Sequence, residues 1–229
     1  MASYLCIIPA RGGSKSLPGK NLRVVAGKPL LVWSIEQALA SIADRVVVST
    51  DSPEIASVAK DAGAEVPFIR PAELATDTAA TEPVLLHALE ELERNGGYRP
   101  EAVVLLQPTC PIRKMGTVDR AIRHFSETGA DSLVGVREIH PFLWENIHNP
   151  KALYDFVNRP RRQDVASEKR LFEETGAMYI TRETFLRQSR NRLGGKIAIF
   201  PMDATESWDI DTESDLLVVD ALLSRKITE

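Results

Sequence analysis

The sequence predicts an α/β protein in which helices cover both faces of a mostly parallel sheet. Short apolar runs such as residues 4–9 and 102–106 lack polar alternation, which is typical of strands buried on both faces. Between such runs, segments such as 29–42 and 81–94 carry apolar residues at helical spacing. The alternation of the two patterns indicates parallel strands connected by helices.

The expected elements follow one another along the chain. Strands are expected at 4–9, 46–48, 66–69, 102–106, 132–136, 177–180 and 197–200. Helices are expected at 29–42, 52–62, 81–94, 117–125 and 215–223. Pro53 supports the start of the second helix, because proline is tolerated at the first helical position, and Gly63 marks its end.

The regular pattern breaks in one place. Residues 140–172 are polar, rich in Pro, Asn and Arg, and lack clean periodicity. We therefore expect one domain over residues 1–229, with an inserted arm at roughly residues 138–175.

Composition excludes several classes of protein. The 229 residues include 28 Lys and Arg against 32 Asp and Glu, a net charge of −4, which disfavours a nucleic-acid binder. Cys6 and Cys110 are far apart and form no CxxC pattern, so neither a disulfide framework nor a zinc site is expected. No stretch approaches the ~20 apolar residues that span a bilayer. We expect a cytoplasmic protein with no membrane segment.

Ligands of such sheets bind beyond the carboxyl ends of the strands, where three unusual loops are expected: 10–21, 107–111 and 209–211. In the first loop, Gly12 and Gly13 let backbone N–H groups approach an anion, and Arg11, Lys15 and Lys20 add positive charge. This combination suits a polyphosphate. The loop has neither Walker A spacing nor a GxGxxG pattern. The alternative is a surface turn with solvated cations.

Asp209 and Asp211 are the candidate metal ligands. In an extended segment their carboxylates share one face while Ile210 turns into the core. Two carboxylates with phosphate oxygens and waters form a typical Mg²⁺ shell. The alternative is helix capping, because Thr212 and Asp215 have the spacing of a capping box, and both roles are compatible.

The first loop also carries a resemblance to a known family. Residues Ile8 to Lys15 (IPARGGSK), followed by Pro18, Lys20 and Asn21, resemble the signature of the acylneuraminate cytidylyltransferases, the CMP-sialic acid synthetases and their relatives. Residues 48–51, 70–78, 106–111, 159–164 and 209–215 resemble further segments of that family in the same order. The resemblance covers essentially the whole chain.

The resemblance implies a Rossmann-like sheet and a homodimer whose inserted dimerisation arm lies near the partner's active site. It also implies a reaction in which the anomeric hydroxyl of a keto sugar acid attacks the α-phosphate of CTP. The products are the CMP-sugar and pyrophosphate, and the reaction needs Mg²⁺.

The resemblance and the chemistry together assign expected roles. Lys15 and Lys20 would neutralise the pyrophosphate above the backbone of Gly12, Gly13 and Ser14. The remaining nucleotide contacts would come from Arg11, Asn21, Arg70, Thr78 and Thr81. The sugar acid would be bound by Gln107, Arg159, Arg161, Arg162 and Gln163, since a guanidinium fork matches a carboxylate. Lys20, Arg161 and Asp211 are the expected catalytic residues, and Asp209 and Asp211 the metal ligands.

Other readings keep the fold. The acceptor could be pseudaminic acid, legionaminic acid or a phosphonate, or GTP could replace CTP. A silent nucleotide-binding module is disfavoured by the intact lysines and by Asp209 and Asp211. A glycosyltransferase would carry its Asp-x-Asp motif near mid-chain, not near the C-terminus.

Overall fold

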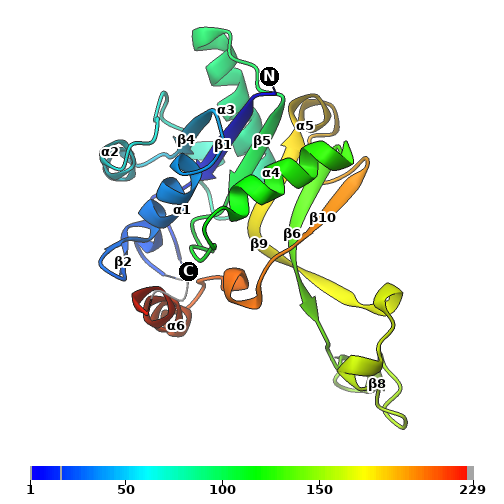
Figure 1. Cartoon of the computed structure of the whole chain (residues 1–229). Coiled ribbons are helices and arrows are strands. Elements are labelled where there is room, and N and C mark those ends of the chain that lie inside the picture. The colour runs from blue at the N-terminus through cyan, green and yellow to red at the C-terminus, as the bar shows by residue number, and fades with distance from the viewer. Residues whose placement is uncertain (1, 16, 226–229) are drawn as a thin grey trace.

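The computed structural model describes residues 2–15 and 17–225 and is built on a six-stranded sheet (Figure 1). The strand order is β10-β6-β9-β5-β1-β4. These strands span β1 Tyr4–Pro9, β4 Arg45–Ser49, β5 Ala102–Leu106, β6 Ser132–Ile139, β9 Leu171–Arg182 and β10 Ile197–Pro201. The β4, β1 and β5 strands are parallel, as are β6 and β10, whereas β9 is antiparallel to both of its neighbours. The predicted mostly parallel sheet is confirmed.

Helices cover the sheet on both sides, as predicted. They are α1 Leu30–Leu39, α2 Pro53–Asp61, α3 Thr81–Gly96, α4 Thr117–Thr128, α5 Glu183–Ser189 and α6 Glu213–Ser224. Two short hairpins pair β2 Val24–Val25 with β3 Lys28–Pro29 and β7 Trp144–Glu145 with β8 Lys151–Ala152. In the described part of the chain, no helix has the length and apolar character needed to cross a membrane.

Alternation along β1 separates the core into two layers. Tyr4, Cys6 and Ile8 pack against the buried faces of α1, α2 and α4, whereas Leu5 and Ile7 pack against α3 and α5. Helix α6 forms a third cluster with the β2–β3 hairpin and the buried Ile210. The last helix is thereby held beside the loop that follows β1.

Two details differ from the expected elements. Residues 66–69 do not form a strand; Glu65 makes only an isolated bridge to Val47. Pro67 explains the difference, because a proline cannot donate to a sheet ladder. Helix α5 was not predicted, since seven residues are too few to display a helical repeat.

Strands β6 and β9 extend beyond the body of the protein as a two-stranded ladder (Figure 1). Residues 140–170 lie at its far end, where Phe142, Trp144, Tyr154 and Phe156 form an aromatic cluster. The Trp144 and Phe156 side chains remain exposed. This projection coincides with the segment in which the sequence pattern breaks.

Phe125 gives a direct test of the first core layer. The Phe125→Ala protein is expected to lose about 3–5 kcal/mol of unfolding free energy, because Phe125 is fully buried between α4 and the sheet. Urea denaturation measures this change. Leu217→Ala, at an exposed position of α6, should change the free energy by less than about 0.5 kcal/mol.

Candidate active site

A cavity of about 340 Å³ opens beyond the carboxyl ends of β1 and β5. Its lining includes nine of the residues predicted from the sequence: Arg11, Gly13, Ser14, Lys20, Asn21, Arg70, Thr81, Gln107 and Asp211. Gly12, Lys15, Thr78 and Asp209 belong to the same segments but do not line it. Four loops far apart in the sequence therefore meet at the edge where parallel-sheet proteins bind ligands.

The loop after β1 is fastened to the end of β4. The N–H of Gly12 donates to Asp51 Oδ1 at 2.9 Å, and a Cβ atom at this position would lie 3.0 Å from Ser52 Cβ. The absence of a side chain at Gly12 therefore lets the two loops approach closely, whereas Gly13 lines the cavity. The Asn21 side-chain amide donates to the Arg11 carbonyl at 2.9 Å and holds the loop from within.

Two cations of this loop share one carboxylate that sequence reasoning missed. Arg11 Nη1 and Lys15 Nζ each lie 2.7 Å from an oxygen of Asp77. The contact with Lys15 lowers the pKa of Asp77 most, and the contact with Arg11 lowers it further, so the Asp77 carboxyl is ionised near neutral pH. Asp77 lines the cavity, so a negative group of the protein occupies the cluster of cations expected to bind phosphate.

Arg70 contributes a buried positive charge to the cavity wall. Its residue is 4% exposed, and Nη2 lies 3.6 Å from Asp51 Oδ1. Burial lowers the pKa of the guanidinium, although Asp51 opposes that effect. Nε and Nη2 are buried without a hydrogen-bond partner among the described residues, which leaves capacity for an anion.

Lys20 connects an N-terminal loop with a segment near the C-terminus of the chain. It is 7% exposed, and Nζ donates to the Ile210 carbonyl at 2.5 Å and to Asp211 Oδ1 at 3.1 Å. A buried ammonium group thus links the loop after β1 to the segment before α6. Lys20 therefore lines the cavity and contacts the Asp211 carboxylate at the same time.

The aspartates flank a fixed backbone point. Ile210 is fully buried and its N–H donates to the Thr109 carbonyl at 2.9 Å, whereas Asp209 and Asp211 are exposed on either side. The capping box of α6 is formed by Thr212 and Asp215, so the carboxylates of Asp209 and Asp211 are not used as caps.

This donor set fits Mg²⁺. Asp211 is 71% exposed and lines the cavity, and carboxylate oxygens are the hard ligands that this ion prefers. Among the described residues no group of three or more His, Cys, Asp or Glu is arranged to hold a metal. An ion at the pair would complete its shell with phosphate oxygens and water, as Mg²⁺ commonly does.

The turn after β5 is held by a buried cation that sequence reasoning also missed. Arg113 donates to the carbonyls of Gln107 and Ala177 and to the side chains of Ser34 and Gln37. Burial lowers its pKa. Arg113 therefore fixes the backbone from which Gln107 reaches the cavity.

The predicted arm residues Arg159, Arg161, Arg162 and Gln163 do not line this cavity. They are exposed near the tip of the arm, where the Arg159 guanidinium stacks on Phe142 and Arg161 pairs with Asp164 at 2.7 Å. Arg162 lines a second cavity of about 400 Å³ within the arm. Within one chain the structure does not bring the two predicted halves of the site together.

Comparison with known proteins places this architecture in a family. A family model described as cytidylyltransferase matches residues 5–224. The post-translational flagellin modification protein B of Campylobacter coli is 32% identical over 99% of this chain and 97% of its own length. The CMP-N,N'-diacetyllegionaminic acid synthase of Legionella pneumophila is 35% identical over 96% of this chain and 95% of its own length.

A further relative and a solved structure extend the comparison. An N-acylneuraminate cytidylyltransferase of Streptococcus agalactiae is 34% identical over 94% of this chain but 52% of its own length. A solved CMP:2-keto-3-deoxy-manno-octonic acid synthetase in complex with CTP has the same fold, with a TM-score of 0.74, 21% identity, and coverage of 98% of this chain and 100% of that one. The match from residue 5 to 224, which spans all four loops that meet at the cavity, shows that the chain belongs to the cytidylyltransferase family.

Proposed function

We propose that this enzyme transfers CMP from CTP to the anomeric hydroxyl of a nonulosonic sugar acid and releases pyrophosphate. The observation that carries the proposal is a single cavity lined by three cations, Arg11, Lys20 and Arg70, and by the carboxylate of Asp211. The family supports the nucleotide chemistry. Relatives named for legionaminic, N-acylneuraminic and pseudaminic acid support the acceptor class.

The triphosphate is the part of the substrates that most needs this cavity. It carries about four negative charges, so its binding and the departure of pyrophosphate both require neutralisation. Arg11, Lys15, Lys20 and Arg70 supply positive charge, and Ser14 and Thr81 offer hydrogen-bonding groups at the wall. Binding of the phosphates exchanges the contacts of Arg11 and Lys15 with Asp77 for contacts with the ligand.

Asp209 and Asp211 would hold Mg²⁺. When bound, the ion neutralises charge on the α-phosphate and lowers the pKa of the attacking hydroxyl. Lys20 keeps the Ile210 carbonyl in place between the two carboxylates. The protein's contribution is positioning and charge, because nucleotidyl transfer asks for little covalent help.

The reaction balances without a further reagent. The anomeric oxygen forms a bond to the α-phosphorus, and the bond from that phosphorus to the α,β-bridging oxygen breaks. Pyrophosphate leaves with the electron pair, and the hydroxyl proton passes to solvent. Lys15 and Lys20 stabilise the charge that develops on the leaving group.

The arm supplies the carboxylate-binding half of the site in a homodimer. Its guanidiniums at Arg159, Arg161 and Arg162 are exposed and distant in sequence from every segment that lines the main cavity. Exposed Trp144 and Phe156 give the same arm an apolar surface to bury against a second copy. Arg161 and Arg162 of one protomer would then orient the sugar acid in the cavity of its partner, with Gln107 contacting the sugar.

Pyrophosphate release across the four ribonucleoside triphosphates and a panel of keto sugar acids tests the function. Release is expected with CTP and a nonulosonic acid, in proportion to added Mg²⁺ until saturation. Absence of release with every pair would favour a silent nucleotide-binding module, and release with GTP alone would reassign the base.

Asp77→Asn should tighten nucleotide binding. The carboxylate competes with phosphate for Arg11 and Lys15, so its neutralisation is expected to lower the KM for CTP roughly threefold. Steady-state kinetics at fixed sugar acid measure the change. Glu73→Gln removes the same charge from the same loop at a residue with no ion pair among the described residues, and should leave the KM unchanged. A higher KM in Asp77→Asn would show that the carboxylate assists binding.

A further inference from the structure

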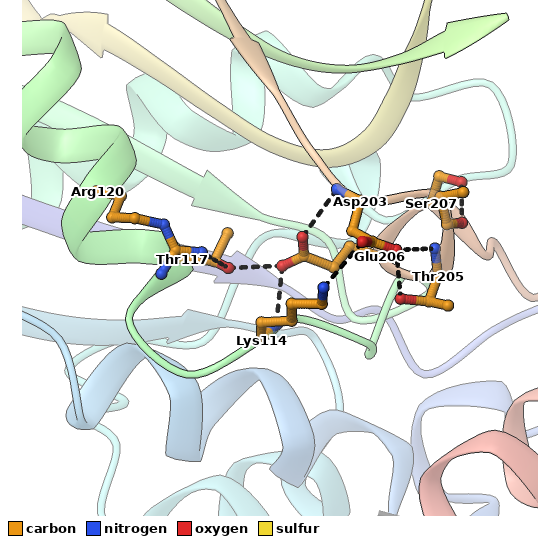
Figure 2. A network of polar contacts seen from close by, with 8 residues as sticks. Lys114, Thr117, Arg120, Asp203, Thr205, Glu206 and Ser207 are labelled. Atoms are coloured by element: carbon orange, nitrogen blue, oxygen red, sulfur yellow. Dashed lines mark hydrogen bonds and ion pairs between the residues drawn. The ribbon is translucent and has the colours of Figure 1, made fainter. Parts of the chain in front are cut away.

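A short 3₁₀ turn, η5 Ala204–Ser207, lies just before Asp209 and is tied to two other parts of the fold. Figure 2 shows its contacts with the segment that leads into α4. On one side, Arg137 Nη1 at the base of the arm donates to Ser207 Oγ at 3.2 Å. On the other side, Glu206 reaches the loop that leads into α4. The turn therefore sits between the arm, the β5–α4 connection and the metal-binding segment.

Glu206 is a buried carboxylate held by neutral donors. Its residue is 3% exposed, and Oε1 accepts hydrogen bonds from the Lys114 N–H at 2.8 Å and from Thr117 Oγ1 at 2.5 Å. Oε2 accepts from the Asp203 N–H at 3.0 Å. Burial of a carboxylate is costly unless its oxygens are hydrogen-bonded, so removal of the Thr117 hydroxyl leaves Oε1 with one donor fewer.

The guanidinium of Arg120 contacts the Thr117 hydroxyl. Arg120 Nη2 donates to Thr117 Oγ1 at 2.8 Å, which leaves the hydroxyl proton of Thr117 directed to Glu206 (Figure 2). The Lys114 ammonium does not contact the Glu206 carboxylate and pairs with Asp203 at 2.8 Å instead. This pair, together with hydrogen bonds from Thr205, lowers the pKa of Asp203 to about 2. The Lys114–Asp203 side-chain pair therefore lies outside the chain of contacts from Arg120 through Thr117 to Glu206, although the backbone N–H groups of both residues also donate to Glu206.

The exposed Asp209 lies between two fixed points. Three residues before it, Glu206 is locked to Thr117; one residue after it, the backbone of Ile210 is locked to Thr109 and Lys20. Both anchors lie on or beside the loop that carries Gln107, residues 107–117. The distance between the sugar-binding turn and the metal-binding carboxylates is therefore set by these contacts.

We infer that Thr117 and Glu206 are positioning residues that place the Asp209 carboxylate for metal binding. The inference rests on the proposed function, since it assumes that Asp209 and Asp211 bind the ion. Groups that orient metal ligands through hydrogen bonds commonly change metal affinity when they are removed. Loss of the Thr117 hydroxyl removes one of the contacts that hold the turn before Asp209, while Ile210 still fixes Asp211.

Binding of Mn²⁺, measured by electron paramagnetic resonance of the free ion, tests this inference without turnover. The full chain is titrated in the presence of a CTP analogue with a methylene bridge between the α- and β-phosphorus atoms. Thr117→Val is expected to raise the Kd for Mn²⁺ roughly tenfold, whereas Thr117→Ser, which keeps the hydroxyl, should bind as the wild type does. Lys114→Met removes the ion pair with Asp203, keeps the backbone N–H that donates to Glu206, and serves as the matched control.

Arg120→Met covers the case in which Thr117→Val does not fold. Arg120 is exposed, and its loss is expected to raise the Kd for Mn²⁺ by a smaller factor, roughly threefold. Wild-type affinity in both variants would overturn the positioning role and leave the proposed function standing. Failure of the wild-type protein itself to bind Mn²⁺ with the analogue would overturn the metal assignment and the inference together.

Discussion

Asp211→Asn is expected to lower kcat for pyrophosphate release by about three orders of magnitude. The reason is that Asp211 is the carboxylate that both lines the cavity and contacts Lys20, and under the proposed function its charge would hold Mg²⁺. Asparagine keeps the size of the side chain and an oxygen that can accept from Lys20. The fold should therefore be intact, which circular dichroism and thermal denaturation check alongside the Mg²⁺-dependent assay.

Glu213→Gln is the matched control for that experiment. Glu213 is an exposed carboxylate two residues further along, where it pairs with Arg23 outside the cavity. Its neutralisation should change kcat less than about twofold. Near-normal activity of Asp211→Asn, or equal losses in the two variants, would remove the metal assignment.

Arg162→Ala should lower kcat/KM for the sugar acid by roughly a hundredfold, because the sugar carboxylate loses the bidentate guanidinium that would bind it. The KM for CTP should stay near its wild-type value. Lys151→Ala removes another cation of the same arm, in the β7–β8 hairpin, and should leave both parameters unchanged. Equal losses for CTP and sugar acid in Arg162→Ala would place this residue outside the sugar site.

A heterodimer of Arg162→Ala and Asp211→Asn tests whether the arm acts on the partner. If it does, the Arg162→Ala protomer receives an intact arm from the other chain, and one of the two sites is complete. Dimers purified through two different tags should then recover about half of the wild-type activity, although each variant alone is nearly inactive. Activity no higher than in the single variants would show that the arm does not complete a partner's site.

The sequence predicted the sheet, the helices on both faces and the loops that form the cavity because these depend on local patterns. Strand β5 was predicted with its observed bounds, since an unbroken apolar run between turn residues admits one interpretation. The wrongly expected strand at 66–69 shows the limit of that argument. The segment is apolar enough for a buried strand, but Pro67 has no backbone N–H to donate to a neighbouring strand. Apolar content alone does not reveal this missing donor.

The residues that the sequence did not reveal act over long separations. Asp77 meets Arg11 and Lys15 across more than sixty residues, and Glu206 meets Thr117 across 89. In the sequence, nothing distinguishes Arg113 from the other arginines. Its role becomes visible only in the structure, where it is buried and donates to the carbonyls of Gln107 and Ala177. No local motif identifies such pairs. Asp209 and Asp211, in contrast, are two residues apart, and this spacing is visible in the sequence.

In the proposed reaction, the hydroxyl of a sugar acid attacks the α-phosphate of CTP in the cavity between β1, β5 and α6. Phosphorus-31 NMR of the reaction with CTP, Mg²⁺ and a nonulosonic acid tests it most directly. We expect one CMP-sugar phosphodiester for each pyrophosphate formed, and neither product with Asp211→Asn. Pyrophosphate accompanied only by free CMP, or no consumption of CTP with any acid of the class, would contradict it.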